Sequence, residues 1–329
     1  MTRSVRIHQF GDADVLNIED VDVGAPAHDE VRLRIHAIGI NRTEITLRSG
    51  RSPSKPALPT GLGFEAAGII DALGENVTGF SVGDRVALVP AYGAAQYSLY
   101  GEMALVPARS LVAIADTTSF VEAAATWAAY GTAWGGLVAV GGLKRGQTVL
   151  VSAASSSVGI AAIQIANRLG ARPLALTRTS AKAEQLRELG AAAVVATTEQ
   201  DVVTEIKALT EARGADLVFD PVGGPQFETL AKATASGGTL ILFGALDARP
   251  TVVPPFDLFA RDLTVRGMAL TALTRDADHL AALKAFVNEG LVDGTLRPVI
   301  ARTFAFERIR DAHRFMEAGE QVGKIVVTL

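Results

Sequence analysis

Cysteine is absent from the 329 residues of this chain. Its absence excludes disulfide bonds, thiolate metal ligands and a cysteine nucleophile. Histidine is scarce, since there are five, and no two of them have the spacing of a metal site. Runs of basic residues are also missing, because the 31 Lys and Arg residues are scattered among 35 Asp and Glu residues. We therefore expect no bound metal and no nucleic-acid partner.

The amino terminus lacks a long apolar run. Its first residues, MTRSVRIHQFGDADV, have no apolar core of the kind that a signal peptide needs, so we expect a cytoplasmic protein with no membrane partner. One uncharged stretch, 123–143, is long enough to cross a bilayer, but its five glycines and many alanines make it only mildly apolar. A buried helix followed by a turn explains this stretch better.

The chain does contain enough apolar material for two domains. Hydrophobic residues make up 49% of it and charged residues 20%, with a formal net charge of -4, which is typical of a globular protein. Its length corresponds to about two domains of ordinary size.

The first segment, to about residue 120, consists of short β-branched or alternating runs separated by glycine and proline. This pattern predicts a partly open barrel or sandwich with little helix. The expected strands lie at 5–9, 31–37, 66–73, 85–89 and 102–106.

Helical and strand patterns alternate from residue 120 onward. The alternation is typical of a doubly wound parallel sheet, whose ligands bind beyond the carboxyl ends of the strands. We expect helices at 120–140, 180–189, 204–211 and 225–235, and strands at 148–151, 172–177, 193–196, 217–220 and 239–244. The tail adds expected strands at 263–267, 300–304 and 324–329 and helices at 277–290 and 306–317. The patterns leave open whether the tail packs on the first segment or on the sheet.

Very small side chains join the strand at 148–151 to the helical pattern that follows it. They leave backbone N–H groups uncovered where a helix begins, so a diphosphate can approach them and the positive end of the helix dipole. Alanine and serine replace the first glycines of the usual dinucleotide fingerprint, and a plain strand-to-helix turn is the alternative. The predicted phosphate-binding residues are Ala154, Ser155, Ser156, Ser157, Val158 and Gly159.

Basic residues follow the next strand, 172–177. At its end, where an Asp or Glu would bind the ribose 2′-hydroxyl of NAD, the chain has Arg178, Thr179 and Lys182. An arginine can meet a 2′-phosphate with paired charge-assisted hydrogen bonds, whereas a carboxylate there would repel it. We expect the cofactor NADPH rather than NADH, and a solvated loop is the alternative.

Several motifs, in their order, resemble those of the medium-chain dehydrogenase/reductase superfamily, in its zinc-independent, quinone oxidoreductase-like branch. They are GIN at 39–41, GLGFEAAG at 61–68, VGDRV at 82–86, YGE at 100–102, LVSAA at 150–154 and GKIVV at 323–327. The resemblance implies an α/β fold with a discontinuous GroES-like β-rich catalytic domain, residues 1–122 and 266–329. A Rossmann-type NADP-binding domain, residues 123–265, is inserted into it. Members of the family are usually dimers or tetramers, which implies a homodimer or a tetramer here.

The same resemblance assigns roles to single residues. Zinc-dependent relatives have a cysteine after the strand at 31–37 and a histidine before the glutamate of the glycine-rich stretch, where this chain has Asn41 or its neighbours and Phe64. Asn41 matches an asparagine near the nicotinamide ribose and the substrate, with a simple turn asparagine as the alternative. The residues expected beside the nicotinamide are Thr132, Phe243, Gly244 and Ala245, and Lys324 is expected to reach the adenosine phosphate unless it is merely exposed.

Without a metal, hydride transfer relies on positioning and on hydrogen-bond donors around the developing anion. Such a site favours electron-poor acceptors. Tyr97 is a candidate for lining the pocket and donating a proton. Arg48 is a candidate for binding an anionic part of the substrate or cofactor, with a surface ion pair as the alternative. We expect an NADPH-dependent reductase of quinones or α,β-unsaturated carbonyl compounds. A ketone or aldehyde reductase, an alcohol dehydrogenase and an NADPH-binding protein with little activity stay open.

Overall fold

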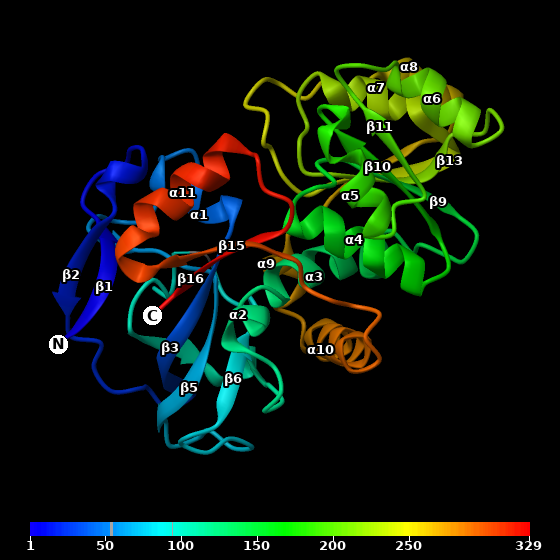
Figure 1. The fold of residues 1–329 in the computed structure, drawn as a ribbon. Coiled ribbons are helices and arrows are strands. Elements are labelled where there is room, and N and C mark those ends of the chain that lie inside the picture. The colour runs from blue at the N-terminus through cyan, green and yellow to red at the C-terminus, as the bar shows by residue number, and fades with distance from the viewer. Residues whose placement is uncertain (53–54, 94) are drawn as a thin grey trace. The chain divides into compact units, whose positions relative to one another are not determined.

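Figure 1 shows the computed structural model of the chain, which describes residues 1–52, 55–93 and 95–329. The chain forms two compact units. Unit 1 consists of Met1–Gly131 and Pro298–Leu329, and unit 2 consists of Thr132–Arg297. The tail therefore belongs with the first segment, a choice that the sequence patterns leave open.

Unit 1 is built mainly from antiparallel strands. One sheet has the order β15-β16-β3-β5-β6-β8, with β7 also paired to β3, and a smaller sheet has the order β2-β1-β4. The strands are β1 (Thr2–Ile7), β2 (Asn17–Val21), β3 (Glu30–Ile40), β4 (Thr60–Gly61), β5 (Glu65–Leu73), β6 (Arg85–Leu88), β7 (Met103–Pro107), β8 (Leu111–Ala113), β15 (Ile300–Ala305) and β16 (Lys324–Thr328). The helices are α1 (Arg42–Arg48), α2 (Phe120–Ala123) and α11 (Ile309–Ala318).

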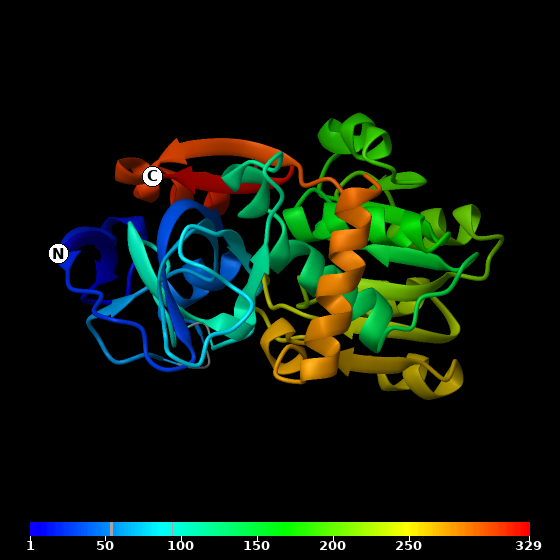
Figure 2. The same cartoon turned by 90° about the horizontal axis from the view of Figure 1, so that it is seen from below.

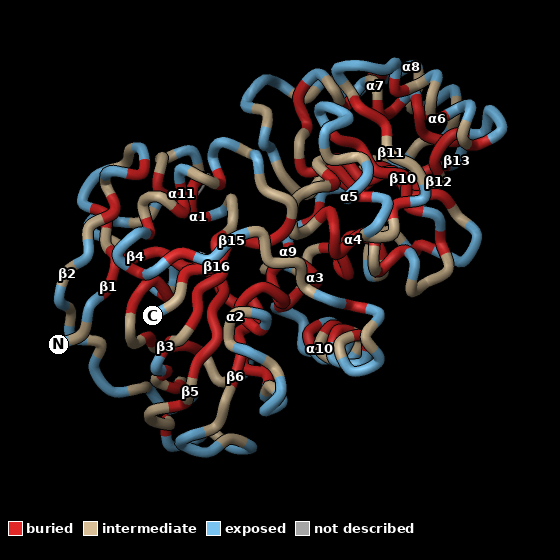
Figure 3. Tube along the Cα trace, viewed as in Figure 1, coloured by how far each residue is buried: buried red, intermediate tan, exposed pale blue. Residues whose placement is uncertain are grey.

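One hydrophobic core holds unit 1 together. It joins apolar side chains from both ends of the chain, such as Leu33 of β3, Phe306 before α11 and Ile325 of β16, all of which are almost completely buried. Figure 3 shows β3 and β5 of this unit as largely buried. The β-rich architecture predicted for the first segment and the tail is confirmed.

The helix α1 was not expected, because the sequence patterns predict little helix before residue 120. It begins after Asn41, whose backbone N–H donates to the Glu44 carboxylate at 2.9 Å. An N-cap residue followed three positions later by glutamate is a known start signal for a helix, and this signal is present at Asn41 and Glu44.

Unit 2 contains a six-stranded parallel sheet with helices on both faces. Its order, β11-β10-β9-β12-β13-β14, is the dinucleotide-binding order 3-2-1-4-5-6, which reverses direction between β9 and β12. The strands are β9 (Thr148–Val151), β10 (Arg172–Thr177), β11 (Ala193–Ala196), β12 (Ala215–Asp220), β13 (Thr234–Leu242) and β14 (Thr264–Gly267). The helices are α4 (Ser157–Arg168), α5 (Ala183–Glu188), α6 (Val202–Leu209), α7 (Gln226–Ala233), α8 (Pro255–Ala260), α9 (Leu270–Leu273) and α10 (Ala277–Val292). The predicted doubly wound sheet is confirmed.

The boundaries between the two units, at 131/132 and 297/298, lie later in the sequence than the expected domain boundaries at 122/123 and 265/266. Residues 266–297 belong to unit 2 because β14 extends its sheet in parallel with β13. The segment after α10 is also tied to α4, since Gln164 and Arg297 exchange two hydrogen bonds of 3.0 and 2.9 Å. The sequence hides this arrangement because β14 is short and exposed, and so lacks the apolar run of a central strand.

The expected helix at 120–140 is interrupted. It is divided into α2, α3 (Trp127–Trp134) and a π-helical segment, Gly135–Val140. Glu65 explains the break, because its carboxylate accepts the backbone N–H of Ala128 in the first turn of α3 at 2.8 Å. In the part of the chain that the structure describes, no helix is long and apolar enough to cross a membrane.

Candidate functional site

The loop between β9 and α4 has the shape that a phosphate group needs. Ser156 is the N-cap of α4, and its hydroxyl accepts the Gly159 N–H at 3.0 Å. The Ala154 N–H is used within the sheet, where it donates to Leu176. Ser157 and Val158 are the first two residues of α4, whose backbone N–H groups have no acceptor within the helix, and Ser155 directly precedes the N-cap. These three amides, at a helix N-terminus, are the predicted donors to a diphosphate.

Gly159 lets α4 approach this loop. A Cβ atom on Gly159 would lie 2.6 Å from both the Cα and the carbonyl oxygen of Ala154, and Ala154 is fully buried. A dinucleotide fingerprint uses its last glycine for the same close packing of helix and strand. This geometry gives Gly159 a packing role, and its predicted part in phosphate binding stays a prediction.

We expect the Gly159→Ala variant to lose about 1–3 kcal/mol of unfolding free energy, because the backbone of the loop must move away from the added methyl group. Urea unfolding of the variant and the wild type measures the loss. Gly93→Ala is the matched control, since its added Cβ meets its nearest neighbour at 3.9 Å. Equal stability losses in the two variants would contradict the packing role of Gly159.

Basic side chains lie at the carboxyl end of β10, next to β9 in the sheet. Arg178 and Thr179 are exposed, and Lys182 is half-buried. The Lys182 ammonium lies 3.4 Å from the Ser155 hydroxyl, which connects the basic strand end to the phosphate-binding loop. The basic strand end and the loop therefore lie next to each other in unit 2.

The carboxyl end of β12 carries a buried acid that sequence analysis missed. Asp220 accepts hydrogen bonds from the Ser152 hydroxyl and from the backbone N–H groups of Val222 and Gly223, and burial raises its pKa. It thereby holds together the two strand ends at the point where the sheet order reverses, where ligands of such sheets bind. An Asp followed by two neighbouring glycines, 220–224, is the signal in the sequence.

The residues expected beside the nicotinamide lie near this strand end or at the start of unit 2. Phe243 stacks on Phe219 with ring centroids 4.0 Å apart, and its N–H donates to the Asp220 carbonyl. Gly244 follows it half-buried and Ala245 is exposed. Thr132, on α3, is half-buried. The contacts of these four residues with a cofactor stay a prediction.

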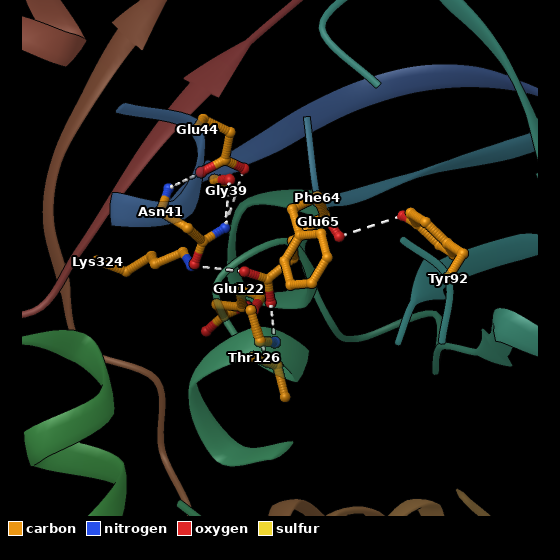
Figure 4. Close-up of polar contacts among 10 residues, drawn as sticks. Gly39, Asn41, Glu44, Phe64, Glu65, Tyr92, Glu122, Thr126 and Lys324 are labelled. Carbon is orange, nitrogen blue, oxygen red and sulfur yellow. Dashed lines mark hydrogen bonds and ion pairs between the residues drawn. The ribbon is translucent and has the colours of Figure 1, made fainter. Parts of the chain in front are cut away.

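A polar network in unit 1 contains Asn41, Glu44, Glu65 and Lys324, and we call it the Asn41 network (Figure 4). The Lys324 ammonium donates to the Asn41 side-chain oxygen at 2.6 Å and to Glu65 at 2.5 Å. Lys324 and Glu65 are 1% and 0% exposed, so the pair is withdrawn from water. The alternative that Lys324 is merely exposed is therefore wrong, and its expected reach to an adenosine phosphate stays a prediction.

Glu44 is the buried acid of the Asn41 network, and burial raises its pKa from 4.5 to about 7. The folded protein therefore keeps a proton on Glu44 that the unfolded chain releases above about pH 4.5. Its contribution to stability is full at low pH and is lost as the pH rises from about 4.5 to 7.

We expect the Glu44→Gln variant to gain about 3 kcal/mol of unfolding free energy relative to the wild type between about pH 4.5 and 8. The amide has no proton to release, so it escapes the destabilisation that the wild type undergoes. Urea unfolding at both pH values measures the difference between the two proteins. A difference that stays constant with pH would show that Glu44 does not titrate in this range.

Arg48 and Tyr97 both have protein partners in unit 1, and their contacts with a ligand stay a prediction. The Arg48 guanidinium is 1% exposed and forms an ion pair with Glu317 at 2.5 Å, so the alternative of an ion pair is present but buried. The Tyr97 hydroxyl donates to Glu30 at 2.8 Å. Burial and this hydrogen bond raise the pKa of Tyr97 to about 12, which makes it a poor proton donor.

His313 is a further buried group that sequence analysis left unassigned. It contacts the Tyr100 hydroxyl through Nε2 at 3.1 Å, and burial, with Arg48 nearby, lowers its pKa to about 3. No three His, Cys, Asp or Glu side chains are grouped as metal ligands anywhere in residues 1–52, 55–93 and 95–329. Both neutral His313 and buried Tyr100 are packing groups of unit 1.

Known proteins are similar to this chain over almost its whole length. A family model described as alcohol dehydrogenase GroES-like domain matches residues 27–133, and one described as zinc-binding dehydrogenase matches residues 157–287. The quinone oxidoreductase of Homo sapiens is 30% identical over 334 residues, which cover 100% of this chain and 98% of the relative. Among solved structures, an NAD-dependent alcohol dehydrogenase is 31% identical, with 99% of each chain covered and a TM-score of 0.92. The Escherichia coli quinone oxidoreductase complexed with NADPH is 26% identical, with 99% and 100% covered and a TM-score of 0.92.

Proposed function

This chain belongs to the medium-chain dehydrogenase/reductase superfamily, among its quinone oxidoreductase-like members, and from this premise we propose that it is a zinc-independent, NADPH-dependent reductase of quinones or α,β-unsaturated carbonyl compounds. The proposal includes a cytoplasmic location. The single observation that carries the cofactor choice is the basic end of β10, where Arg178 and Lys182 lie beside the phosphate-binding loop and no carboxylate follows the strand directly. A relative in the same fold is complexed with NADPH, which supports this choice.

The residues of the chain hold and orient such a cofactor. The amides of Ser155, Ser157 and Val158 would donate to the diphosphate, and Arg178 with Lys182 would neutralise the 2′-phosphate. Bound NADPH supplies the hydride, and the protein supplies orientation and electrostatics. None of Tyr92, Tyr97 and Tyr100 has a pKa suited to protonating the reduced substrate, since burial raises the pKa of each. A quinone or an enone needs no such proton donor from the protein, because its reduced form is a delocalised anion that solvent can protonate.

The test is NADPH consumption by EDTA-treated protein with four acceptors: a quinone, an enone, an aldehyde and a simple ketone. The same panel is repeated with NADH. We expect turnover of the quinone or the enone with NADPH, and little turnover with NADH. Turnover of the ketone or aldehyde alone would overturn the substrate class, and loss of activity with EDTA that zinc restores would overturn zinc independence.

A second candidate function is ketone reduction or alcohol oxidation. One observation favours it, namely the likeness to a solved NAD-dependent alcohol dehydrogenase at 31% identity. The basic end of β10 weighs against the NAD part of that likeness, and the acceptor panel distinguishes the two functions. Tight NADPH binding without turnover of any acceptor would favour a binding protein.

The proposal also includes a homodimer that pairs through β14. This strand is the edge of the parallel sheet, and Figure 2 shows it (gold) at the outer side of unit 2. Next to it α8 presents Phe256 and Phe259, which are 77% and 69% exposed and pack on each other. Two copies of β14 can pair antiparallel around a two-fold axis, and an axis at Thr264 would bring Asp262 of one copy beside Arg266 of the other.

We expect the Val265→Lys variant to be monomeric at concentrations where the wild type is dimeric, because with the axis at Thr264 each new charge would lie opposite the apolar Leu263 of the other copy and diagonally across from the second new lysine. Sedimentation velocity measures the mass of both proteins. Val292→Lys is the control, since Val292 is exposed on α10, away from β14 in the sequence. A dimer that survives the Val265→Lys change would place the interface elsewhere.

A further inference from the structure

Asp220, the last residue of β12, is a buried acid that the proposed function leaves without a role. It is 0% exposed. Its carboxylate accepts hydrogen bonds from the Ser152 hydroxyl, from the Val222 N–H at 3.0 Å and from the Gly223 N–H at 2.9 Å. Hydrogen bonds to a carboxylate favour its ionised form. These three donors carry no net charge, so Asp220 is a buried negative charge that they stabilise but do not neutralise.

Backbone hydrogen bonds fix this charge at the point where the sheet order reverses. Ser152 directly follows β9, and its N–H donates to the Phe219 carbonyl of β12 at 3.1 Å. Phe243 directly follows β13, and its N–H donates to the Asp220 carbonyl at 3.0 Å. Asp220 is thus tied to the carboxyl ends of three neighbouring strands of unit 2, where a doubly wound sheet binds its ligands.

Charges of opposite sign lie on the two sides of β9 at this edge of the sheet. Arg178 and Lys182 follow β10 on one side, whereas Asp220 ends β12 on the other. The proposed function directs the 2′-phosphate to the β10 side and the diphosphate to the loop after β9. The nicotinamide of the same dinucleotide then extends to the β12 side, which carries the carboxylate.

Hydride transfer changes the charge of the nicotinamide ring. The acceptor takes a hydride from the neutral ring of NADPH and a proton from solvent, and the ring becomes the cation of NADP⁺. A fixed negative charge stabilises this cation and has little effect on the neutral ring. The transition state already carries part of the positive charge, so the same carboxylate would also lower the barrier to hydride release.

We propose that Asp220 is an electrostatic positioning residue, which stabilises the oxidised cofactor NADP⁺ relative to NADPH on unit 2 and so favours hydride release. The inference rests on the proposed function and deepens it, because it gives the same cofactor site a preference for one redox state. Since Asp220 is fully buried, it acts through its charge and not by contact with the cofactor.

The test compares the dissociation constants of NADP⁺ and NADPH in the wild type and four variants. Asp220→Asn removes the charge, and its amide oxygen can still accept the N–H two residues further on. Asp220→Ser is a second neutral variant, whose hydroxyl makes the same contact more weakly. Ser152→Ala keeps the charge and removes one of its hydrogen bonds. Asp216→Asn is the matched control at the other end of β12, where the Asp216 carboxylate accepts the Thr148 N–H at 2.7 Å.

We expect both neutral Asp220 variants to raise the Kd of NADP⁺ about 10-fold, as Coulomb's law gives for unit charges about 12 Å apart at an effective dielectric constant of about 20. The Kd of NADPH should change by less than about 2-fold, because its ring is neutral. Ser152→Ala and Asp216→Asn should leave the ratio of the two constants as it is in the wild type. Adenosine 2′,5′-bisphosphate, which lacks the nicotinamide, should bind all variants equally.

An equal rise of both constants in a folded Asp220 variant would overturn the inference, since Asp220 would then only shape the strand ends. Two unchanged constants would overturn it as well. A change of the ratio in Asp216→Asn as large as that in Asp220→Asn would also overturn it, because the effect would then belong to the net charge of the protein.

The proposed function and this inference fail in different ways. A wild-type protein that binds NADPH and NADP⁺ but turns over no acceptor would refute the proposed function, while the two dissociation constants would still decide the role of Asp220. A wild-type protein that binds neither form would refute both.

Discussion

Replacing Lys324 with methionine is expected to cost about 3–5 kcal/mol of unfolding free energy, the largest stability change that we predict. The variant leaves the Glu65 carboxylate fully buried without its cation. Removing one partner of a buried pair has this effect because the other charge then lacks both water and a counter-ion. Denaturant unfolding of the variant and the wild type measures the loss.

The double variant Lys324→Met/Glu65→Leu is the control for this prediction. It removes both charges, and apolar replacement of a whole buried pair is often close to neutral, so most of the stability should return. A loss as large in the double variant as in the single one would show that packing or the Ala128 contact, not the unpaired charge, causes the damage. The comparison thus separates electrostatics from shape.

Removing the two basic side chains at the end of β10 is expected to raise the Kd of NADPH about 100-fold, because hydrogen bonds to a charged group contribute about 1.5–3 kcal/mol each. The Kd of NADH should change by less than about 2-fold, since NADH has no 2′-phosphate. The variant is Arg178→Ala/Lys182→Ala, and both constants are measured by fluorescence titration. A smaller salt dependence of NADPH binding should accompany the change.

Arg187→Ala is the matched control, because Arg187 is an exposed arginine on α5, the helix that follows these residues. It removes a positive charge from the same region without touching the strand end. If Arg178→Ala/Lys182→Ala raised the Kd of NADPH and the Kd of NADH by the same factor, these residues would support the structure of the phosphate-binding loop itself. In that case the NADPH preference would have to come from another part of unit 2.

Most of the fold was predictable because its signals are local. The strands of the parallel sheet are apolar runs, and α4 has helical spacing directly after small residues, so the order of elements in unit 2 follows from the sequence. The exposed strand β14 shows where this reasoning ends, because the strand is predicted at 263–267 but the sheet that it joins is not. An edge strand lacks the continuous apolar run of a central strand, so its sequence does not assign it to the parallel sheet.

The candidate site was predictable only in part. The cofactor-side residues follow one another along the chain, so their neighbourhood is visible in the sequence. The contact of Lys324 with Asn41 joins residues 283 positions apart, and no local pattern reports it. Arg48 illustrates the same limit, since a charged residue reads as exposed until a distant partner, here Glu317, is known.

The last strand of the chain has a consequence for the order of folding. On the ribosome β16 emerges after every other element, yet it pairs with β3 and supplies the counter-ion of Glu65. Unit 2 is a continuous segment and can fold during synthesis, whereas the sheet of unit 1 must wait with an open edge along β3 until β16 has been synthesised. Nascent chains of unit 1 are therefore the stage at which this protein is most exposed to aggregation and most dependent on chaperones.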